Sequence, residues 1–114
     1  MILFKEESKE KILSGLKWQT RKLWDRPRAK EGSEHLIYLR PPMTGEKPFA
    51  RILIKRVWRQ RLGDMTAEEA RAEGYPTIKA FLEQFQKINS RKVKGNLRET
   101  VVYCVEFQLV EKFL

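Results

Sequence analysis

Residues 49–62, FARILIKRVWRQRL, form the longest candidate β-strand of the sequence. Charged residues interrupt the apolar ones at every second or third position, a pattern typical of a strand with one face in water. The segment that follows, DMTAEEARAEG at residues 64–74, predicts a short helix. Thr66 stands at its N-cap with Glu69 three residues later, which is the capping-box signature, and Gly74 ends it. We therefore assign the remaining segments around a long strand followed by a capped helix.

Those remaining segments predict a chain in which strands dominate. Further strands are expected at residues 1–4, 17–24, 35–40 and 99–114, and further helices at residues 5–15 and 77–88. The second of these helices has one apolar stripe, formed by Ile78, Phe81, Leu82, Phe85 and Ile88. The last strand alternates, and its buried face is expected to hold Tyr103, Val105, Phe107 and Leu109. Because strands and helices do not alternate regularly, we expect an α+β fold built on a small barrel or curled sheet, not a doubly wound sheet.

Composition restricts the classes of protein that fit. The 114 residues suit a single domain, residues 1–114, with 41% hydrophobic content for its core. One cysteine, Cys104, and one histidine, His35, exclude a disulfide framework and a zinc site built mainly from these residues, so we expect no metal and no cofactor. Cys104 lies in an apolar strand and is expected in the core. No apolar run approaches the roughly 18 residues of a membrane span and no signal-type segment is present, so we expect a cytoplasmic protein without membrane contact.

The charge of the chain favours polyanionic partners. Its formal net charge is +9 and its sequence pI is near 9.9. The cations gather in three clusters: Lys17, Arg21, Lys22, Arg26, Arg28 and Lys30; Arg51, Lys55, Arg56, Arg59 and Arg61; and Lys87, Arg91, Lys92, Lys94 and Arg98. Two phosphate contacts from each cluster would make log affinity fall with log salt at a slope of roughly −4 on single strands. A soluble protein that is merely rich in Lys and Arg is the alternative.

Three tryptophans lie inside the first two clusters. Aromatic rings beside cations suit single-stranded nucleic acid, where each stacked base contributes about 1–3 kcal/mol. Large aromatics are also usually buried, so Trp24 and Trp58 are equally open to interpretation as core residues. Trp18, between Lys17 and Gln19, fits either an exposed position or the lining of a site.

Two motifs resemble those of a known family. Residues 12–22, ILSGLKWQTRK, resemble the opening motif of the ASCH domain, a member of the PUA-like superfamily, at Gly15, Lys17, Thr20, Arg21 and Lys22. Residues 57–75 resemble the family's central strand, Thr-capped helix and Glu-Gly-aromatic exit. With the IKAFLEQF helix and the VVYCVEF strand in the expected order, the resemblance runs along nearly the whole chain. It implies a PUA-like β-pseudobarrel of about five to six strands, with a short N-terminal helix and two consecutive helices inserted before the last strand.

The resemblance also implies a nucleic-acid-binding module that uses a basic cleft around the Gly-x-Lys-x-x-Thr-Arg motif. RNA is the favoured partner, with a single strand as one form of it. The residues that we expect to bind are Lys17, Trp18, Arg21, Lys22, Arg26, Arg28, Arg56, Arg59, Arg61, Arg91, Lys92 and Lys94. One departure concerns Trp18, because relatives often have a small residue or threonine there. Its ring would narrow a small-molecule pocket or offer a stacking face.

An enzymatic alternative follows from the same resemblance. Some bacterial members with this motif are amidohydrolases that remove acetyl from acetylcytidine, which implies catalytic roles for Lys17, Thr20 and Glu73 and a nucleoside as partner. A threonine hydroxyl needs a base beside it, and a lysine whose pKa is lowered by neighbouring cations is a candidate. Residues 17 and 20 of a strand point to opposite faces, so a bulge or turn is required. The non-catalytic alternative has a turn-forming Thr20, a phosphate-binding Lys17 and a Glu73 that is either a surface carboxylate or paired with one of the arginines. A protein-interaction module is a third hypothesis. The oligomeric state stays open.

Overall fold

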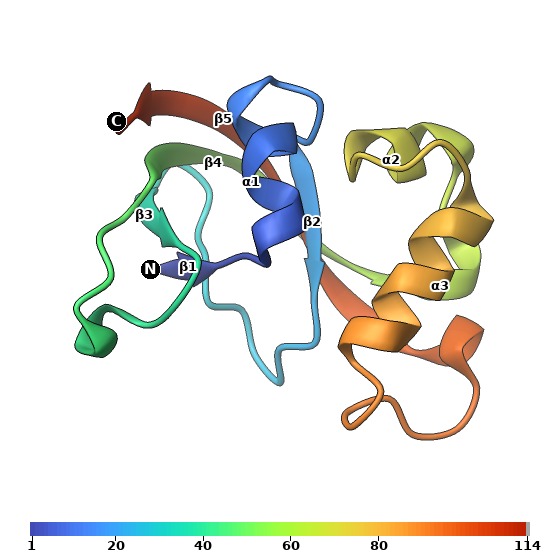
Figure 1. The fold of residues 1–114 in the computed structure, drawn as a ribbon. Helices are drawn as coiled ribbons and strands as arrows, with labels where there is room; N and C mark the ends of the chain where they lie inside the picture. Colours follow the sequence, from blue (N-terminus) through green and yellow to red (C-terminus); the bar gives the residue numbers. More distant parts are fainter. Residues whose placement is uncertain (114) are drawn as a thin grey trace.

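The computed structural model describes residues 1–113, which form one curled five-stranded sheet with three α-helices (Figure 1). The strands are β1 (Ile2–Leu3), β2 (Gln19–Lys22), β3 (Glu34–Tyr38), β4 (Ala50–Arg61) and β5 (Val101–Lys112). The helices are α1 (Glu6–Leu13), α2 (Ala67–Ala72) and α3 (Ile78–Ile88). Within the sheet the order is β1-β3-β4-β5-β2, with β1 parallel to β3 and every other pair antiparallel. The expected α+β half-barrel, with one early helix and two helices before the last strand, is confirmed.

The two long strands β4 and β5 curl the sheet. They pair from Ala50 with Lys112 to Arg61 with Val101, and the register shifts twice along the way. Val110 is the extra residue on β5 at the first shift, and Lys55 is the extra residue on β4 at the second. Each such bulge bends its strand and increases the local twist. The sheet therefore presents two differently shaped faces, each of which needs its own covering elements.

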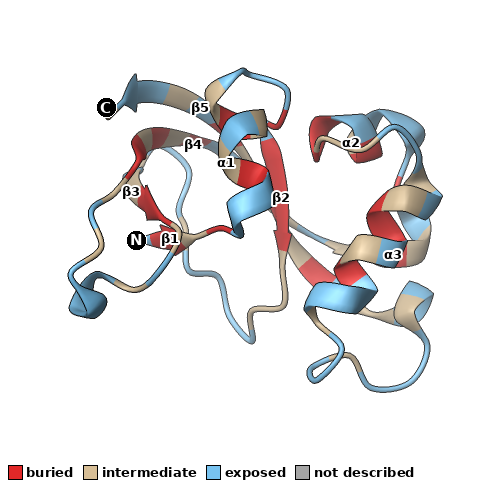
Figure 2. Cartoon of the chain, in the orientation of Figure 1, coloured by how far each residue is buried: buried red, intermediate tan, exposed pale blue. Residues whose placement is uncertain are grey.

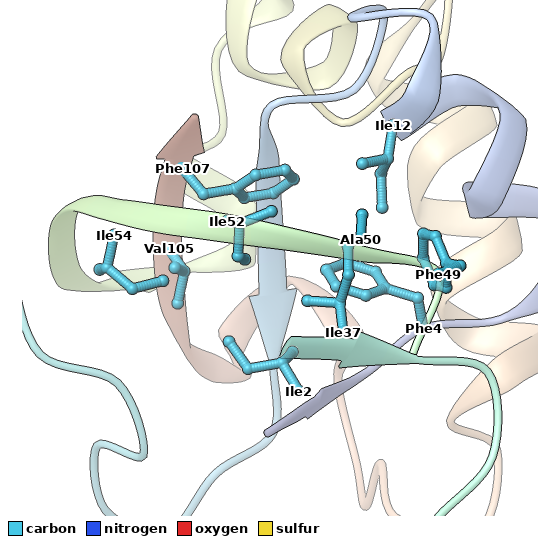
Figure 3. Packing of buried hydrophobic residues seen from close by; sticks show 10 residues of the cluster. All are labelled: Ile2, Phe4, Ile12, Ile37, Phe49, Ala50, Ile52, Ile54, Val105 and Phe107. Atoms are coloured by element: carbon cyan, nitrogen blue, oxygen red, sulfur yellow. The ribbon is translucent and has the colours of Figure 1, made fainter. Parts of the chain in front are cut away.

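The first hydrophobic core lies between α1 and one face of the sheet; its buried residues are red in Figure 2 and drawn as sticks in Figure 3. Ile12 of α1 packs there against sheet residues such as Ile52, and Trp24 packs at its margin. The strand β5 contributes Val105 and Phe107 to the same core. Helix α1 is thus held by tertiary packing, as its shortness requires.

The second core lies between the other face of the sheet and α3. Phe81, Leu82 and Phe85 of α3 are buried there, each stabilising the fold by about 1.5–3 kcal/mol. The apolar stripe ends at this point, because Ile88 is 39% exposed and the expectation that it packs inward is wrong. In Figure 1 the α2–α3 pair lies on the opposite side of the molecule from β1 and β3.

This second core also corrects the expected pattern of β5. Tyr103, Val105 and Phe107 do alternate with Cys104 and Glu106, but the strand is buried on both faces rather than on one. Cys104 is fully buried beneath α3, which confirms its expected place in a core, whereas Tyr103 is only half-buried. The reason is that β5 passes from one core to the other, so alternation alone does not decide burial.

Local signals around α2 are confirmed in detail. The Thr66 hydroxyl accepts from the Glu69 backbone N–H, and the Glu69 carboxylate accepts from the Thr66 backbone N–H. Gly74 follows the helix with φ of +92°, a conformation that glycine adopts without strain. The segment at residues 41–48, expected to lack regular structure, contains one short 3-10 turn at Pro42–Thr44. In residues 1–113, no helix is both long enough and apolar enough to span a membrane.

Candidate functional site

The ends of α1 and α2 lie side by side and bring two of the predicted site residues together. The chain leaves α1 through Gly15, whose φ is +82°, and the backbone N–H of Trp18 then donates to the carbonyl of Ala72. This bond places the segment before β2 against the last turn of α2. Lys17 therefore meets Glu73, although the two residues are 56 positions apart in the chain.

Lys17 and Glu73 form a buried ion pair that Arg21 completes. Lys17 Nζ lies 2.9 Å from Glu73 Oε1, and Arg21 Nη1 lies 3.1 Å from Glu73 Oε2. The exposed fractions of the three residues are 6%, 2% and 5% respectively. Buried charges persist in proteins only when paired, so the single carboxylate of Glu73 shared by two cations makes this contact a fixed part of the fold.

Glu69 and two glutamines extend the pair into a network. Arg21 donates through Nε to Gln60 Oε1 at 3.0 Å and through Nη1 to Gln19 Oε1 at 3.0 Å. Gln60 Nε2 in turn donates to Glu69 Oε1 at 2.9 Å. Arg21 Nη2 lies 2.9 Å from Glu69 Oε2 but without the angle of a hydrogen bond, so this contact is an ion pair only. The network ties α2 to three strands of the sheet and fixes the guanidinium of Arg21.

Hydrogen bonding and a nearby cation hold the carboxyl of Glu69 in its charged form. Burial raises the pKa of that carboxyl, but bonds from the Thr66 backbone and Gln60, with the charge of Arg21, outweigh it and lower the pKa. Glu69 thus serves at once as helix cap and as counter-ion. The capping box, a local signal, is continuous with the buried network.

Thr20 lies on the opposite face of β2 from this network. It pairs with Val105 of β5, while its neighbours Gln19 and Arg21 point toward α2. All three predicted catalytic residues are buried, and the direct contact among them joins Lys17 to Glu73. Lys17 is paired with a carboxylate and therefore does not present a free amine to the threonine hydroxyl.

An open hollow of about 580 Å³ lies beside the network, between the start of β2 and the helix α2. Trp18, 45% exposed, stands in its wall, which agrees with the expected exposed or site-lining position. The cations lining the hollow are Arg56 and Arg71, and the carboxylates lining it are Glu68, Glu69 and Glu106. The hollow is thus of mixed charge, and Lys17 and Thr20 lie behind its wall. The expected basic cleft around the motif is therefore not basic in its lining.

Lys22 closes the gap between the two edges of the sheet. Its amine donates to the carbonyl of Leu3 in β1, and lies 4.7 Å from the ring centre of Phe4. Burial, with help from the charges of Lys17, Lys5 and Lys92, lowers the pKa of Lys22 to about 8, while the charge of Glu73 acts in the opposite direction. Lys22 is therefore a structural amine at the barrel seam.

A row of basic and aromatic side chains crosses β2, β5 and β4 at the end remote from the hollow. Lys22 pairs with Tyr103, and Tyr103 pairs with Arg59, so the three share one face of the sheet. The ring of Tyr103 lies 6.3 Å from that of Trp24, and the guanidinium of Arg59 lies 5.6 Å from the Tyr103 ring centre. We name this set the Tyr103 surface: Trp24, Arg59 and Tyr103, with Lys22 beside them.

The remaining predicted cations divide by their partners. Three of them are exposed but have a carboxylate within 4.0 Å. Arg28 pairs with Asp25, Arg56 with Glu106, and Arg61 with both Asp64 and Glu99. Among the predicted binding residues within residues 1–113, five cations are exposed and have no carboxylate at that distance, namely Arg26, Arg59, Arg91, Lys92 and Lys94. Trp58 is half-buried against the second core and carries the Arg56 guanidinium 3.9 Å above its ring.

Some participants were absent from the predicted site. Gln60 and Glu69 bind Arg21, and Tyr103 forms the centre of the basic aromatic row. The signal for Glu69 was its place in the capping box, but the sequence gives no sign that the same carboxylate reaches a distant arginine. No three His, Cys, Asp or Glu side chains in residues 1–113 converge on a position for a metal ion.

Comparison with known proteins identifies the fold. No protein-family model and no curated protein sequence matches the chain. A crystal structure from Enterococcus faecalis, described by the family model DUF984, matches with a TM-score of 0.74 and 16% identity over 98% of this chain and 80% of that one. An ASCH domain from Lactobacillus crispatus matches with a TM-score of 0.72 and 18% identity, over 90% of this chain and 69% of that one. The chain therefore has the fold of the ASCH domain, as the motifs at residues 12–22 and 57–75 predicted.

Proposed function

We propose that the protein binds single-stranded nucleic acid, RNA in particular, through the Tyr103 surface. The observation that carries this proposal is the contact of Trp24, Tyr103 and Arg59 on one face of the sheet, where Arg59 is exposed and has no carboxylate within 4.0 Å in residues 1–113. The ASCH-domain fold, shared with the solved structures above, is consistent with this class of partner.

The chemistry of a single strand matches this surface in two ways. Half-buried rings such as Trp24 and Tyr103 offer faces on which bases stack, with about 1–3 kcal/mol for each base. Arg59 is exposed and anchored over the Tyr103 ring, so its guanidinium is positioned to meet a phosphate with little further ordering. Lys92 is exposed on the loop after α3, and we include it among the phosphate contacts.

This proposal revises the expected list of binding residues. Lys17 and Arg21 are buried and neutralised by Glu73 and Glu69, so contact with phosphate would require breaking their ion pairs. We assign them to the framework that holds α2 against the sheet. The phosphate contacts are assigned instead to those predicted binding cations that are exposed and have no carboxylate within 4.0 Å in residues 1–113: Arg26, Arg59, Arg91, Lys92 and Lys94.

Fluorescence anisotropy with a labelled twelve-nucleotide oligouridine tests the proposal. Arg59→Ala and Lys92→Ala should each weaken binding by about three- to tenfold, the loss of one phosphate contact. Arg40→Ala is the matched control, since Arg40 is equally exposed but pairs with Glu46 near β3. Equal losses in all three variants would mean that only net charge matters, and would contradict a defined surface. The matched oligodeoxythymidine measures the preference for RNA.

A second candidate function rests on the buried contact of Lys17 with Glu73. The two residues match positions implied in acetylcytidine amidohydrolases, and their amine and carboxylate lie 2.9 Å apart. In this arrangement the Lys17 amine is held by the Glu73 carboxylate, so Lys17 could act as a base for Thr20 only after this contact breaks.

Release of cytidine from acetylcytidine tests this second candidate. Activity that disappears in Thr20→Ala and Lys17→Met but survives in Arg59→Ala would favour the amidohydrolase. Absence of turnover at micromolar protein, together with oligouridine binding, would leave the binding function alone.

A further inference from the structure

The strand β4 leaves part of one edge open. It pairs with β5 along its whole length, but β3 covers only residues Ala50–Leu53 on its other side. The backbone bonds between Ile54 and the turn before β3, Gly32 N–H to Ile54 O and Ile54 N–H to Ser33 O, are the last on that side. From residue 55 to residue 61, no further strand of residues 1–113 lies against this edge.

The register shows which backbone groups point outward. The backbone N–H of Leu62 donates to the carbonyl of Thr100, on the β5 side. Backbone groups alternate in direction along a strand, so the N–H and C=O groups of residues 60, 58 and 56 also point toward β5. The main-chain groups of Val57, Arg59 and Arg61 therefore point away from β5. These three N–H and three C=O groups lie at the open edge, and no strand of residues 1–113 pairs with them. Such a row is a template for one more strand.

The side chains decide which kind of strand fits. Lys55 and Arg59 are exposed, and neither has a carboxylate within 4.0 Å in residues 1–113, whereas Arg61 already pairs with Asp64 and Glu99. An antiparallel second copy of this edge centred on Arg59 would set two Arg59 side chains directly opposite each other, which is destabilising. The phosphates of a nucleic-acid backbone only accept hydrogen bonds, so the backbone donors for the outward carbonyl groups would be limited to the 2′-hydroxyls of RNA. An extended peptide satisfies both donors and acceptors, and acidic side chains complement Lys55 and Arg59.

We propose that the open edge of β4 at Val57–Arg61 binds an extended, acidic segment of a partner protein as an added β-strand. The edge is a protein-interaction surface distinct in chemistry from nucleic-acid binding, and it does not depend on that function. The cations at the edge act in two ways: they prevent edge-to-edge association of identical chains and they select an acidic partner.

Isothermal titration with synthetic peptides tests this surface. The probe is an acetylated and amidated octapeptide of alternating valine and glutamate, which should bind saturably below about 1 mM at low salt. The same peptide N-methylated at its two central residues keeps its charge but loses an N–H on each edge, and its affinity should fall at least tenfold. A valine–lysine peptide should not bind.

Two protein variants locate the contact. Arg59→Pro removes an outward N–H and the charge, and proline is tolerated at strand edges, so this variant should fold and lose more affinity than Arg59→Ala. Arg40→Ala, away from the edge, should bind like the wild type. Equal binding of the N-methylated and unmodified peptides would reduce the contact to charge attraction and overturn the proposal. The absence of binding by the valine–glutamate peptide would also overturn the proposal. Both of these outcomes are measured on the wild-type chain, so they remain decisive even if Arg59→Pro fails to fold.

Discussion

Replacing Glu73 with glutamine should strongly destabilise the fold. The substitution preserves shape but removes the carboxylate that two buried cations share, at 2.9 Å from Lys17 Nζ and 3.1 Å from Arg21 Nη1. Arg21 keeps Glu69, whereas Lys17 has no second carboxylate within 4.0 Å in residues 1–113. Removing one partner of a buried pair costs about 3–5 kcal/mol, a large share of the roughly 5–15 kcal/mol that stabilises a typical domain.

A double-mutant cycle isolates the charge from the packing. Lys17→Met leaves Glu73 paired with Arg21, and the double variant Lys17→Met with Glu73→Gln should regain about 1–3 kcal/mol relative to the sum of the single changes. Urea denaturation gives each free energy of unfolding. Glu83→Gln is the matched control, because Glu83 lies in an exposed pair with Lys79 at 4.0 Å, and it should change stability little.

A small effect would refute this reasoning. If Glu73→Gln costs no more than Glu83→Gln, or if the single changes simply add, the buried pair of Lys17 with Glu73 contributes no measurable stability. The assignment of Lys17 and Arg21 to the framework that holds α2 would then fail.

Three further predictions concern single positions. Burial lowers the pKa of Lys22 to about 8, so between pH 8 and 10.5 the unfolded chain binds this proton more tightly than the folded chain. The wild type should therefore gain stability relative to Lys22→Met as the pH rises through this range. Parallel pH profiles of the two proteins in urea denaturation would contradict this. Gly74 has φ of +92°, and a Cβ added there would lie 2.8 Å from Lys11 Cδ. Gly15 has φ of +82°, but an added Cβ would meet no atom within 4 Å. Gly74→Ala should therefore lower the thermal midpoint more than Gly15→Ala. Thr66→Ala should cost about 1 kcal/mol in urea denaturation, because it removes the cap of α2, and an unchanged free energy of unfolding would argue against the capping box.

The sequence predicted those elements that local chemistry determines. The capping box at Thr66 and Glu69 and the positive φ of Gly74 follow from residues within one turn of each other, and both are present. Burial in β5 was predicted less well, because α3 covers Cys104 on the second face of the strand. This cover depends on how the sheet curls and not on the alternation of apolar and polar residues along β5. Ile88 continues the helical period but extends past the edge of the sheet that α3 covers.

The candidate site shows the same division. The motif signals Lys17 and Glu73, yet nothing local indicates that Arg21 shares their carboxylate or that Gln60 and Glu69 hold its guanidinium. The clusters of cations in the sequence contain both available and neutralised members, because their carboxylate partners come from distant segments. Their sum therefore overestimates the number of phosphate contacts.

The salt dependence of oligouridine binding tests the central claim most directly. Five predicted binding cations, Arg26, Arg59, Arg91, Lys92 and Lys94, are exposed without a carboxylate within 4.0 Å in residues 1–113. They give an expected slope of log affinity against log salt of about −3.5 on single strands. Arg59→Ala should make that slope shallower by about 0.7, while Arg40→Ala should leave it unchanged. A flat response, or a slope that Arg59→Ala does not alter, would contradict nucleic-acid binding through the Tyr103 surface.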